Sequence, residues 1–459
     1  MWVLLPLLFI LVCMLANFAS AESKTQENFQ NSCNNIICDH PIVKDSRLIV
    51  KLVYRANSTS ATNELSPAST MTFIGHDILI LNKNNGTIFR IKNGTMQDRP
   101  LLDVNVANER ERGLLGIATS KANNGTTYVF LYYTESKHDN TDVCHTNNYC
   151  VPSTNPLGNR LYRYELKNDR LVNPTLLLDL PASPGPSHNG GVIKIGPDKN
   201  LYFPIGDLTG FVNESTRTMA QNYKNGTNPD GRAGILRITQ DGKPVQDGIL
   251  GRGFPINLYY AYGIRNSFGI DFDPLTGNLW DTENGPEYGD EINLVKPGFN
   301  SGWSAVQGIW KPTEIVDPRF DLVAGEKLLH PKDLVDFGEK GKYSLPEFIW
   351  KKAIGVTAIK FLNSDKLGKN YEDDMFVGCF SLGIIFHFDL NKDRTSLKLN
   401  APLKDKIADN TNNTQELQDI AFAKGLGAIS DIEIGPDGFM YVLTKYDPRL
   451  AIFKIAPRD

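Results

Sequence analysis

The sequence predicts an all-β protein, a six-bladed β-propeller, and three observations lead to this prediction. Short β-rich runs alternate with turns of Gly, Pro, Asp and Asn along most of the chain. Apolar residues hardly ever recur at helical spacing between these runs, which argues against βαβ units. The pattern repeats every several tens of residues, which favours a closed ring, because closure leaves only short, protected strand edges. An array of two β-sandwich domains is the alternative.

Six segments repeat the order strand, turn, strand. They are Phe73 to Leu81, Gly113 to Thr134, Gly190 to Asp207, Ser267 to Gly285, Thr357 to Phe380 and Ile429 to Thr444. In three of them the turn contains Gly-Pro-Asp or Asp-Pro, at Gly196, Asp273 and Gly435. Pro presets φ in such turns and Gly supplies positive φ, so hairpins are expected. We assign residues 46–459 to the propeller.

The N-terminus has the features of an export signal. Residues 1–21 are an apolar run ending in Ala19-Ser20-Ala21, a small-x-small pattern that signal peptidase accepts. Because no Lys or Arg precedes the run, an uncleaved membrane anchor is the alternative. Residues 22–45 are polar and Asn-rich, and we expect an irregular segment there. The chain is therefore expected to be secreted or held at the cell surface.

The cysteines agree with an oxidising compartment. Cys33 with Cys38, and Cys144 with Cys150, form two close pairs in Asn-rich loops and are predicted as disulfides. Zinc sites that include the nearby His40 and His145 are the alternative. Cys379 lies in an apolar run and is expected to be a buried free thiol.

Composition excludes one class of function and agrees with glycosylation. A formal net charge of -4 without a cluster of Lys and Arg argues against a general nucleic-acid binder. With 41% hydrophobic residues the chain can bury a large core unaided. Asn-x-Ser/Thr sequons occur at Asn57, Asn85, Asn93, Asn124, Asn213, Asn225 and Asn412.

Two loops contain side chains suited to proton transfer and anion stabilisation. His188 stands in a loop of Pro and Gly directly before a strand, where a general base or a histidine that braces the loop is equally compatible. Arg265 and Asn266 stand together at the start of another strand. Both side chains donate hydrogen bonds, so the pair suits a developing oxyanion, and an Arg buried against a carboxylate is the alternative.

Two further loops are rich in charge. The segment from Asp281 to Glu291 is dense in carboxylates broken by Gly and Pro, which suits Ca²⁺, although a solvated acidic loop would look similar. The segment from Asn108 to Gly116 alternates in charge and could present Glu111 or Arg112 to the channel. Surface solvation is the alternative for most of these charges.

Four motifs together resemble the soluble quinoprotein glucose/sorbosone dehydrogenases. They are ERGLLGIA, the His188 loop followed by IGPDKNLYFPIGD, YGIRNSFGIDFDP, and ENGPEYGDEINLVKPGFNSGW. The resemblance extends from about Gly113 to the C-terminus. It implies a six-bladed propeller that holds pyrroloquinoline quinone (PQQ) and Ca²⁺ and oxidises the C1 hydroxyl of aldoses.

The resemblance also implies roles for individual residues. His188 matches the base, Arg265 the residue that stabilises the oxyanion, and Asn266 a cofactor ligand. Asp207 matches an acidic residue at the end of its strand, and Trp350 the aromatic residue against the quinone. The carbonyls of Gly285 and Pro286 match ligands of the active-site Ca²⁺, and Asp290 and Glu291 match a region associated with structural calcium.

The chain departs from the family where cations meet the carboxylates of the cofactor. A family Lys aligns with Ser381, and paired Arg residues align with Ala428 and Ser430. A family Gln aligns with Glu111, which adds negative charge. Compensating cations could come from Lys351 and Lys352, or from Arg110 and Arg112.

These considerations give one main hypothesis and two alternatives. The main hypothesis is an exported PQQ-dependent and calcium-dependent dehydrogenase of aldoses or related alcohols, with an electron acceptor that the sequence does not define. The first alternative is a non-catalytic propeller that binds glycans or protein at the cell surface. The second, a calcium-dependent lactonase, is weaker because the acids cluster in one loop.

Overall fold

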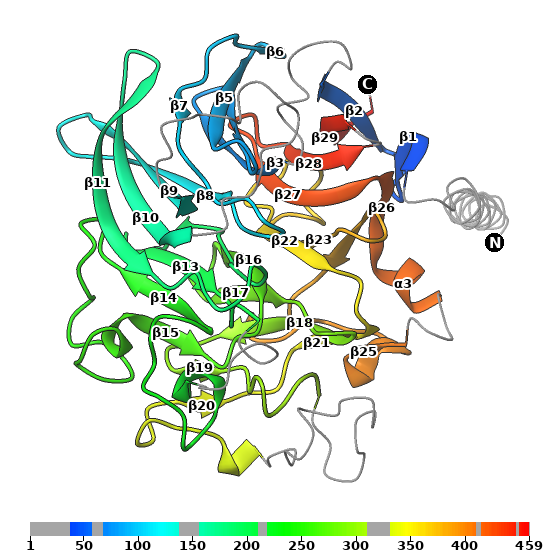
Figure 1. Cartoon of the computed structure of the whole chain (residues 1–459). Helices are drawn as coiled ribbons and strands as arrows, with labels where there is room; N and C mark the ends of the chain where they lie inside the picture. Colours follow the sequence, from blue (N-terminus) through cyan, green and yellow to red (C-terminus); the bar gives the residue numbers. More distant parts are fainter. Residues whose placement is uncertain are drawn as a thin grey trace, which may run out of the picture.

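The computed structural model describes residues 37–56, 68–136, 156–209, 218–309, 331–409, 415–446 and 449–458. Within these ranges the strands form six sheets that stand around a common centre (Figure 1). The α-helix α3 (Gln415–Ile420) lies outside the sheets. The prediction of an all-β propeller is confirmed.

The sheets follow the chain around the ring. Three of them, in pairing order, are β3 (Ala68–Ile74), β4 (Asp77–Asn82), β5 (Thr87–Lys92) and β6 (Thr95–Met96), with β7 (Leu102–Asp103) also on β5; β11 (Arg170–Leu180), β10 (Pro156–Lys167), β9 (Thr127–Ser136) and β8 (Leu114–Lys121); and β12 (Lys194–Ile195), β13 (Leu201–Ile205), β14 (Gly234–Ile238), β15 (Tyr259–Tyr262), β19 (Phe299–Asn300) and β20 (Lys342–Tyr343). The other three are β16 (Ser267–Phe272), β17 (Leu279–Glu283), β18 (Tyr288–Val295), β21 (Phe348–Lys352) and β25 (Ile407–Ala408); β1 (Ile37–Val43), β26 (Ala421–Leu426), β24 (Ile384–Phe388), β23 (Met375–Cys379) and β22 (Val356–Phe361); and β2 (Leu48–Arg55), β29 (Arg449–Pro457), β28 (Met440–Tyr446) and β27 (Ala428–Ile434).

Each repeated segment of the sequence falls on an antiparallel strand pair in a different sheet. The pairs are β3 with β4, β8 with β9, β12 with β13, β16 with β17, β22 with β23, and β27 with β28. The Gly-Pro-Asp turns close these hairpins as expected, since Gly438 N–H donates to Gly435 O at 2.9 Å. The repeat read from the sequence is therefore the pair of strands at one end of each sheet.

The hydrophobic core lies between neighbouring sheets. In β4, Ile78 and Ile80 pack toward the sheet that contains β28, while Leu79 and Leu81 pack toward the sheet that contains β9. Alternate residues of a strand point to opposite faces, so one strand can fill two cores. Similar clusters join each of the four remaining pairs of neighbouring sheets in the described part. The packing therefore runs continuously around the ring.

The N-terminal strands tie the ring together. Strand β2 pairs with β29, the last strand of the described chain, and β1 pairs with β26 in the adjacent sheet. The expected irregular segment 22–45 is corrected at its end, because residues 37–43 form strand β1, which pairs with β26. The signal peptide 1–21, Cys33, Cys144 and Cys150 lie outside the described residues, so the disulfides and the signal stay predictions. No helix of the described part is long and apolar enough to cross a membrane.

The loops of interest meet at one end of the ring. His188 and Arg265 come just before the strands β12 and β16, and Asp207 and Asn284 come just after their hairpin partners β13 and β17. In an antiparallel hairpin the start of the first strand and the end of the second lie at the same edge. Cys379 lies at this end of β23 as a buried free thiol, as predicted.

Candidate active site

His188 and Asp207 form a hydrogen-bonded pair at this end of the ring. Nδ1 of His188 lies 2.6 Å from Oδ1 of Asp207, and Asp207 is fully buried. The His188 side chain keeps 11% of its surface exposed, and no partner is recorded for its Nε2. A base with one nitrogen held by a carboxylate and the other open has the arrangement needed for proton abstraction.

Asp207 is itself held by three donors. Besides His188, the indole Nε1 of Trp303 donates to Oδ2 at 2.9 Å, and the N–H of Thr209 donates to Oδ1 at 2.9 Å. Burial alone would raise the pKa of Asp207, but the hydrogen bond and charge of His188, the charge of Arg265 and the Trp303 bond outweigh burial and lower it. Asp207 therefore stays ionised and stabilises a positive charge on His188.

The backbone brings the His188 and Arg265 loops together on the end of β13. Gly206 N–H donates to His188 O at 3.1 Å, and Asp207 N–H donates to Arg265 O at 3.0 Å. A Cβ atom on Gly206 would lie 2.3 Å from Arg265 O and 2.6 Å from His188 O, so a larger residue would push the loops apart. His188 itself has φ +65°, a conformation that costs a non-Gly residue about 1 kcal/mol or more.

Arg265 is partly buried among acidic groups. Its Nη1 donates to Asn284 O at 2.7 Å, and its guanidinium carbon lies 5.4 Å from the Trp303 ring centre. Burial lowers the pKa of Arg265, and the charges of Asp207 and Glu283 oppose this shift. The guanidinium has five N–H groups, so it can bind a further oxygen.

Glu111 also contacts the His188 loop. Its Oε2 accepts the His188 N–H at 2.6 Å, and its charge acts on Arg265. The Glu111 residue is exposed. The prediction that Glu111 faces the site agrees with this contact, which places a carboxylate next to His188.

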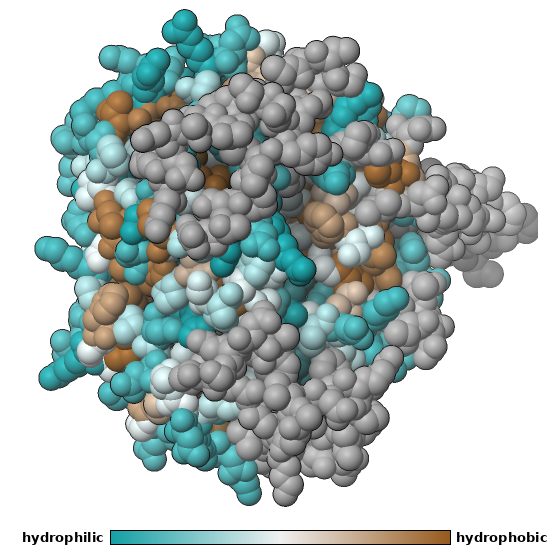
Figure 2. Space-filling view, in the orientation of Figure 1, coloured by the Kyte–Doolittle hydropathy of each residue, from teal (hydrophilic) through white to brown (hydrophobic). Residues whose placement is uncertain are grey.

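Three further groups offer unused polar atoms. The Asn266 side chain has no recorded hydrogen bond although the residue is 7% exposed, and only its backbone oxygen accepts, from Asn284 N at 2.9 Å. The carbonyl oxygens of Gly285 and Pro286 likewise have no recorded donor among the described residues. Hydrophilic side chains dominate the middle of the face in Figure 2, over the region of β16 to β18, as a polar ligand requires.

Asp290 is held by backbone N–H groups of two loops. Its Oδ2 accepts N–H groups from Ile354, Gly355 and Val356 at 2.8, 2.7 and 3.3 Å, and its Oδ1 accepts Gly285 N–H at 2.9 Å. Burial raises the pKa of Asp290, and these bonds oppose the shift. These bonds fix the Gly285 loop to the start of β22, and the assignment of Asp290 as a calcium ligand stays a prediction.

Glu291 is also held by hydrogen bonds from a neighbouring loop. Its Oε1 accepts Gly308 N–H at 2.6 Å and Gln307 Nε2 at 2.9 Å, and its Oε2 accepts Asn293 Nδ2 at 3.1 Å. The residue is 1% exposed. The carboxylate therefore connects β18 to the loop at Gly308, and its assignment to a metal site stays a prediction.

Glu283 and Asp281 lie behind Arg265 and were not singled out from the sequence. Glu283 accepts Arg265 N–H at 2.7 Å and Ser301 Oγ at 2.7 Å, and burial raises its pKa to about 7. Asp281 is fully buried with neither oxygen hydrogen-bonded, and burial and the charge of Glu283 raise its pKa strongly. Both alternate with Thr282 on β17, so period-two spacing places them on one face.

Comparison with known proteins agrees with this geometry. The sequence profile of the family described as glucose / sorbosone dehydrogenase matches residues 65–451. The chain belongs to the glucose/sorbosone dehydrogenase family. It is 28% identical over 313 residues to quinoprotein glucose dehydrogenase B of Acinetobacter calcoaceticus, covering 65% of this chain and 62% of that protein. It is 29% identical over 230 residues to aldose sugar dehydrogenase YliI of Escherichia coli (strain K12), covering 49% and 51% of the two.

The fold of the family is seen in solved structures as well. The PQQ-bound form of an aldose sugar dehydrogenase from Streptomyces coelicolor superposes with a TM-score of 0.58 at 20% identity, covering 89% of this chain and 99% of that one. At this identity the likeness concerns the fold. The chain spans only about half to two thirds of the curated relatives that it matches.

Trp350 cannot have the place that the family resemblance gave it. It is fully buried between Phe348, Phe386 and Phe388, with ring centroids 5.0, 5.3 and 6.2 Å away. A ring with no exposed surface cannot lie against a cofactor, so this interpretation is corrected. Trp303, on the Arg265 guanidinium and the Asp207 carboxylate, is the aromatic residue at the site.

Two of the expected compensating cations, Lys351 and Arg112, are engaged elsewhere. Lys351 Nζ lies 3.3 Å from Asp409 Oδ2, and Lys352 is exposed opposite Tyr288 at the edge of β21. Arg112 is buried and its Nη2 donates to the backbone oxygen of Ala182. Among the described residues, no contact joins Lys352 to His188 or Arg265.

The three aligned cation positions lie on the strands at this end of the ring. Ser381 is exposed just after β23, while Ala428 and Ser430 stand in β27, with Ala428 only 8% exposed. None of these side chains carries charge. Among the described residues the guanidinium of Arg265 contacts the Asn284 loop, and Arg112 Nη2 lies 3.4 Å from Gly185 O in the His188 loop.

Proposed function

We propose that this protein is an oxidoreductase that oxidises the C1 hydroxyl of aldose sugars or related alcohols, with PQQ and calcium. The observation that carries the proposal is the His188–Asp207 pair beside Arg265. A pure binding surface has no need for a base, a carboxylate that orients it and an oxyanion donor in one place.

The residues divide the work of hydroxyl oxidation. The open Nε2 of His188 accepts the hydroxyl proton, and ionised Asp207 stabilises the imidazolium that results. Arg265, with free N–H groups, stabilises the negative charge that develops on the substrate oxygen. Bound PQQ would supply the quinone that takes the hydride from C1, so one proton and one hydride leave the sugar and a lactone is formed.

The residues fit one part of the cofactor. The unused carbonyls of Gly285 and Pro286 are hard oxygen ligands of the kind that Ca²⁺ takes, and the Asn266 amide can hold a quinone oxygen. Lys352 and Glu111, which we also assigned to the cofactor, would act at its edge.

The residues fit the carboxylates of PQQ poorly. Ser381, Ala428 and Ser430 provide no charge, and Glu111 adds a negative one. At roughly 1.5–3 kcal/mol for each charge-assisted hydrogen bond, several kcal/mol of affinity would be lost. We therefore expect PQQ to bind weakly.

We further propose that each of the six sheets is one blade, which gives a six-bladed propeller, and that the chain is exported. The continuous packing between neighbouring sheets supports the first proposal. The small-x-small pattern before Glu22 supports the second.

Reconstitution tests the function. The purified protein is titrated with PQQ in excess Ca²⁺, and aldose-dependent reduction of a redox dye is measured, with EDTA-treated protein as the control. Dye reduction that needs sugar, PQQ and Ca²⁺ together is expected. Absence of turnover, together with no change in the PQQ absorbance, would reject the proposal.

A non-catalytic propeller that binds glycans or protein is the second candidate. The specific observation in its favour is the uncharged set at Ser381, Ala428 and Ser430, combined with Glu111 against His188. Under this function, sugar binding would persist in the absence of PQQ, and His188→Ala would leave that affinity nearly unchanged.

A further inference from the structure

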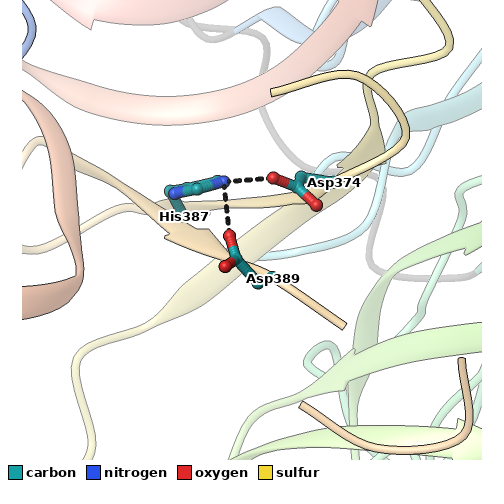
Figure 3. A group of neighbouring side chains, drawn as sticks. All are labelled: Asp374, His387 and Asp389. Carbon is teal, nitrogen blue, oxygen red and sulfur yellow. Dashed lines mark hydrogen bonds and ion pairs between the residues drawn. The ribbon is translucent and has the colours of Figure 1, made fainter. Parts of the chain in front are cut away.

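A second group of ligand-type side chains lies on the hairpin of β23 and β24. Asp374 directly precedes β23, His387 belongs to β24, and Asp389 directly follows β24. The hairpin pairs Met375 with Phe388, which brings the three side chains together (Figure 3). Nε2 of His387 lies 2.8 Å from Asp374 Oδ2 and 3.6 Å from Asp389 Oδ1.

This group is remote from His188. Strand β22 begins at Val356, whose oxygen accepts Asn284 Nδ2, and ends at Phe361, which pairs with Met375 beside Asp374. Five residues of strand at about 3.3 Å each separate the two ends by roughly 17 Å. The group therefore belongs to the opposite end of the blade and plays no part in the reaction proposed above.

The donor atoms have the spacing of a metal site. One ligand atom from each of Asp374, His387 and Asp389 lies within 4.8 Å of the other two. Ligands bound at about 2.0–2.2 Å in a tetrahedron stand roughly 3.3–3.6 Å apart, so small side-chain movements suffice. Mixed imidazole and carboxylate ligands suit zinc and related divalent ions, whereas Ca²⁺ takes oxygen ligands only.

The surrounding residues orient the ring and leave negative charge in excess. The His387 imidazole packs against Phe376 at 5.0 Å and the edge of Tyr371 at 5.2 Å. The nearest cation is Lys398, whose Nζ lies 3.4 Å from the other Asp389 oxygen and whose side chain is 65% exposed. The neighbouring Arg394 is engaged with Asp273 instead. Two carboxylates thus share one histidine at a half-buried position.

We propose that Asp374, His387 and Asp389 bind a divalent transition-metal ion, with zinc as the preferred ion, which holds the β23–β24 hairpin closed. Water completes the coordination, because Asp389 is 44% exposed and leaves one side open. The same three groups could instead form an ion pair with protonated His387, and metal titration separates the two.

The protein is first stripped of metal with EDTA, and the EDTA is then removed. Zinc is titrated into this protein in excess Ca²⁺, which saturates the Gly285 loop, and binding is followed by calorimetry. One equivalent of zinc should bind and should raise the midpoint of thermal unfolding of the protein. Cobalt in place of zinc should give the visible absorption of a site with nitrogen and oxygen ligands. No zinc binding by the wild type would overturn the proposal.

Variants of these residues test whether the bound zinc ion lies at this site. Asp389→Asn and His387→Gln should weaken zinc about tenfold or more and abolish the rise in the unfolding midpoint. Asp389 is partly exposed, so its variant is expected to fold, and exposed His76→Gln is the matched control. If Asp389→Asn and His387→Gln bind the same equivalent as tightly as the wild type, the metal lies elsewhere and the assignment is wrong.

Discussion

Asp207 accepts hydrogen bonds from two side chains of different loops, His188 Nδ1 at 2.6 Å and Trp303 Nε1 at 2.9 Å. The carboxylate is fully buried, and each of its oxygens is used. One residue therefore sets both the orientation of the base and the position of the indole beneath Arg265.

Asp207→Asn should lower kcat by about 10²–10⁴-fold, because a neutral amide has one acceptor oxygen for these donors and cannot stabilise imidazolium. KM should change little. Steady-state kinetics of the reconstituted enzyme measures this. Trp303→Phe, which removes one donor and keeps the carboxylate, should cost much less; equal losses in the two variants would contradict the account.

Glu283 should make stability depend on pH near neutrality. Its pKa rises from about 4.3 in the unfolded chain to about 7 in the fold because of burial. The contribution of Glu283 to the free energy of unfolding is fully present below its unfolded pKa and is lost as pH rises through 7. The loss is on the order of 3 kcal/mol. Asp281 and Glu291, whose pKa values burial also raises, add to the same trend.

Denaturant unfolding between pH 5 and pH 9 checks the role of Glu283. The free energy of unfolding should fall with rising pH, and Glu283→Gln, which is neutral throughout, should flatten the fall. A wild-type stability that is constant or rises over this range would show that the carboxylate is ionised at little cost.

Glu433 joins three sheets at the end of the ring away from His188. Its oxygens accept Lys194 Nζ at 2.7 Å and Lys360 Nζ at 2.6 Å. Glu433→Gln removes the carboxylate that contacts both lysines, leaves Asp271 at 3.9 Å from Lys360 Nζ, and should destabilise the protein by about 3–5 kcal/mol. The control is Asp247→Asn, whose partner Arg252 is 83% exposed, and which should not change the unfolding midpoint measurably.

The same glutamate predicts acid sensitivity. Burial opposes ionisation, but the two lysines outweigh it and lower the pKa of Glu433 to about 2. Its contribution to stability is therefore present above about 4.3 and is lost as pH falls toward 2. Glu433→Gln should remove that part of the acid transition; an unchanged acid midpoint would argue against the network.

Glu111→Gln should tighten PQQ binding. The Gln oxygen can still accept the His188 N–H, so the loop is kept while one negative charge is removed. Adding Ser381→Lys should tighten binding further, by about tenfold or more for a formed charge-assisted hydrogen bond. Equilibrium titration with PQQ gives both values, and unchanged affinity in the double variant would mean that the carboxylates lie elsewhere.

The fold could be predicted from the sequence because its signals are local. Gly435-Pro436-Asp437-Gly438 fixes a turn, and alternating residues such as Ile78 to Leu81 fix the two faces of a strand. His188, Arg265 and Asn266 could also be found, because polar residues stood in Gly-rich and Pro-rich loops before strands. The structure then brought them together from separate sheets.

The remainder depended on long-range contacts. The sequence did not reveal that the N–H groups of Ile354, Gly355 and Val356 would donate to Asp290. Trp350 looked available until sheet packing buried it under Phe386. The spacing of neighbouring residues could not predict either contact, because each partner lies more than thirty residues away in the sequence.

The central claim is that His188 acts as a base on a sugar hydroxyl, and an isotope-sensitive comparison of the wild type with His188→Ala tests it most directly. Both proteins are reconstituted with PQQ and Ca²⁺ and given an aldose with hydrogen or deuterium at C1. The account predicts slower turnover of the deuterated sugar by the wild type, and a loss of about 10²-fold or more in His188→Ala with PQQ affinity retained. Turnover by His188→Ala equal to that of the wild type, or no oxidation of any aldose by the reconstituted wild type, would contradict it.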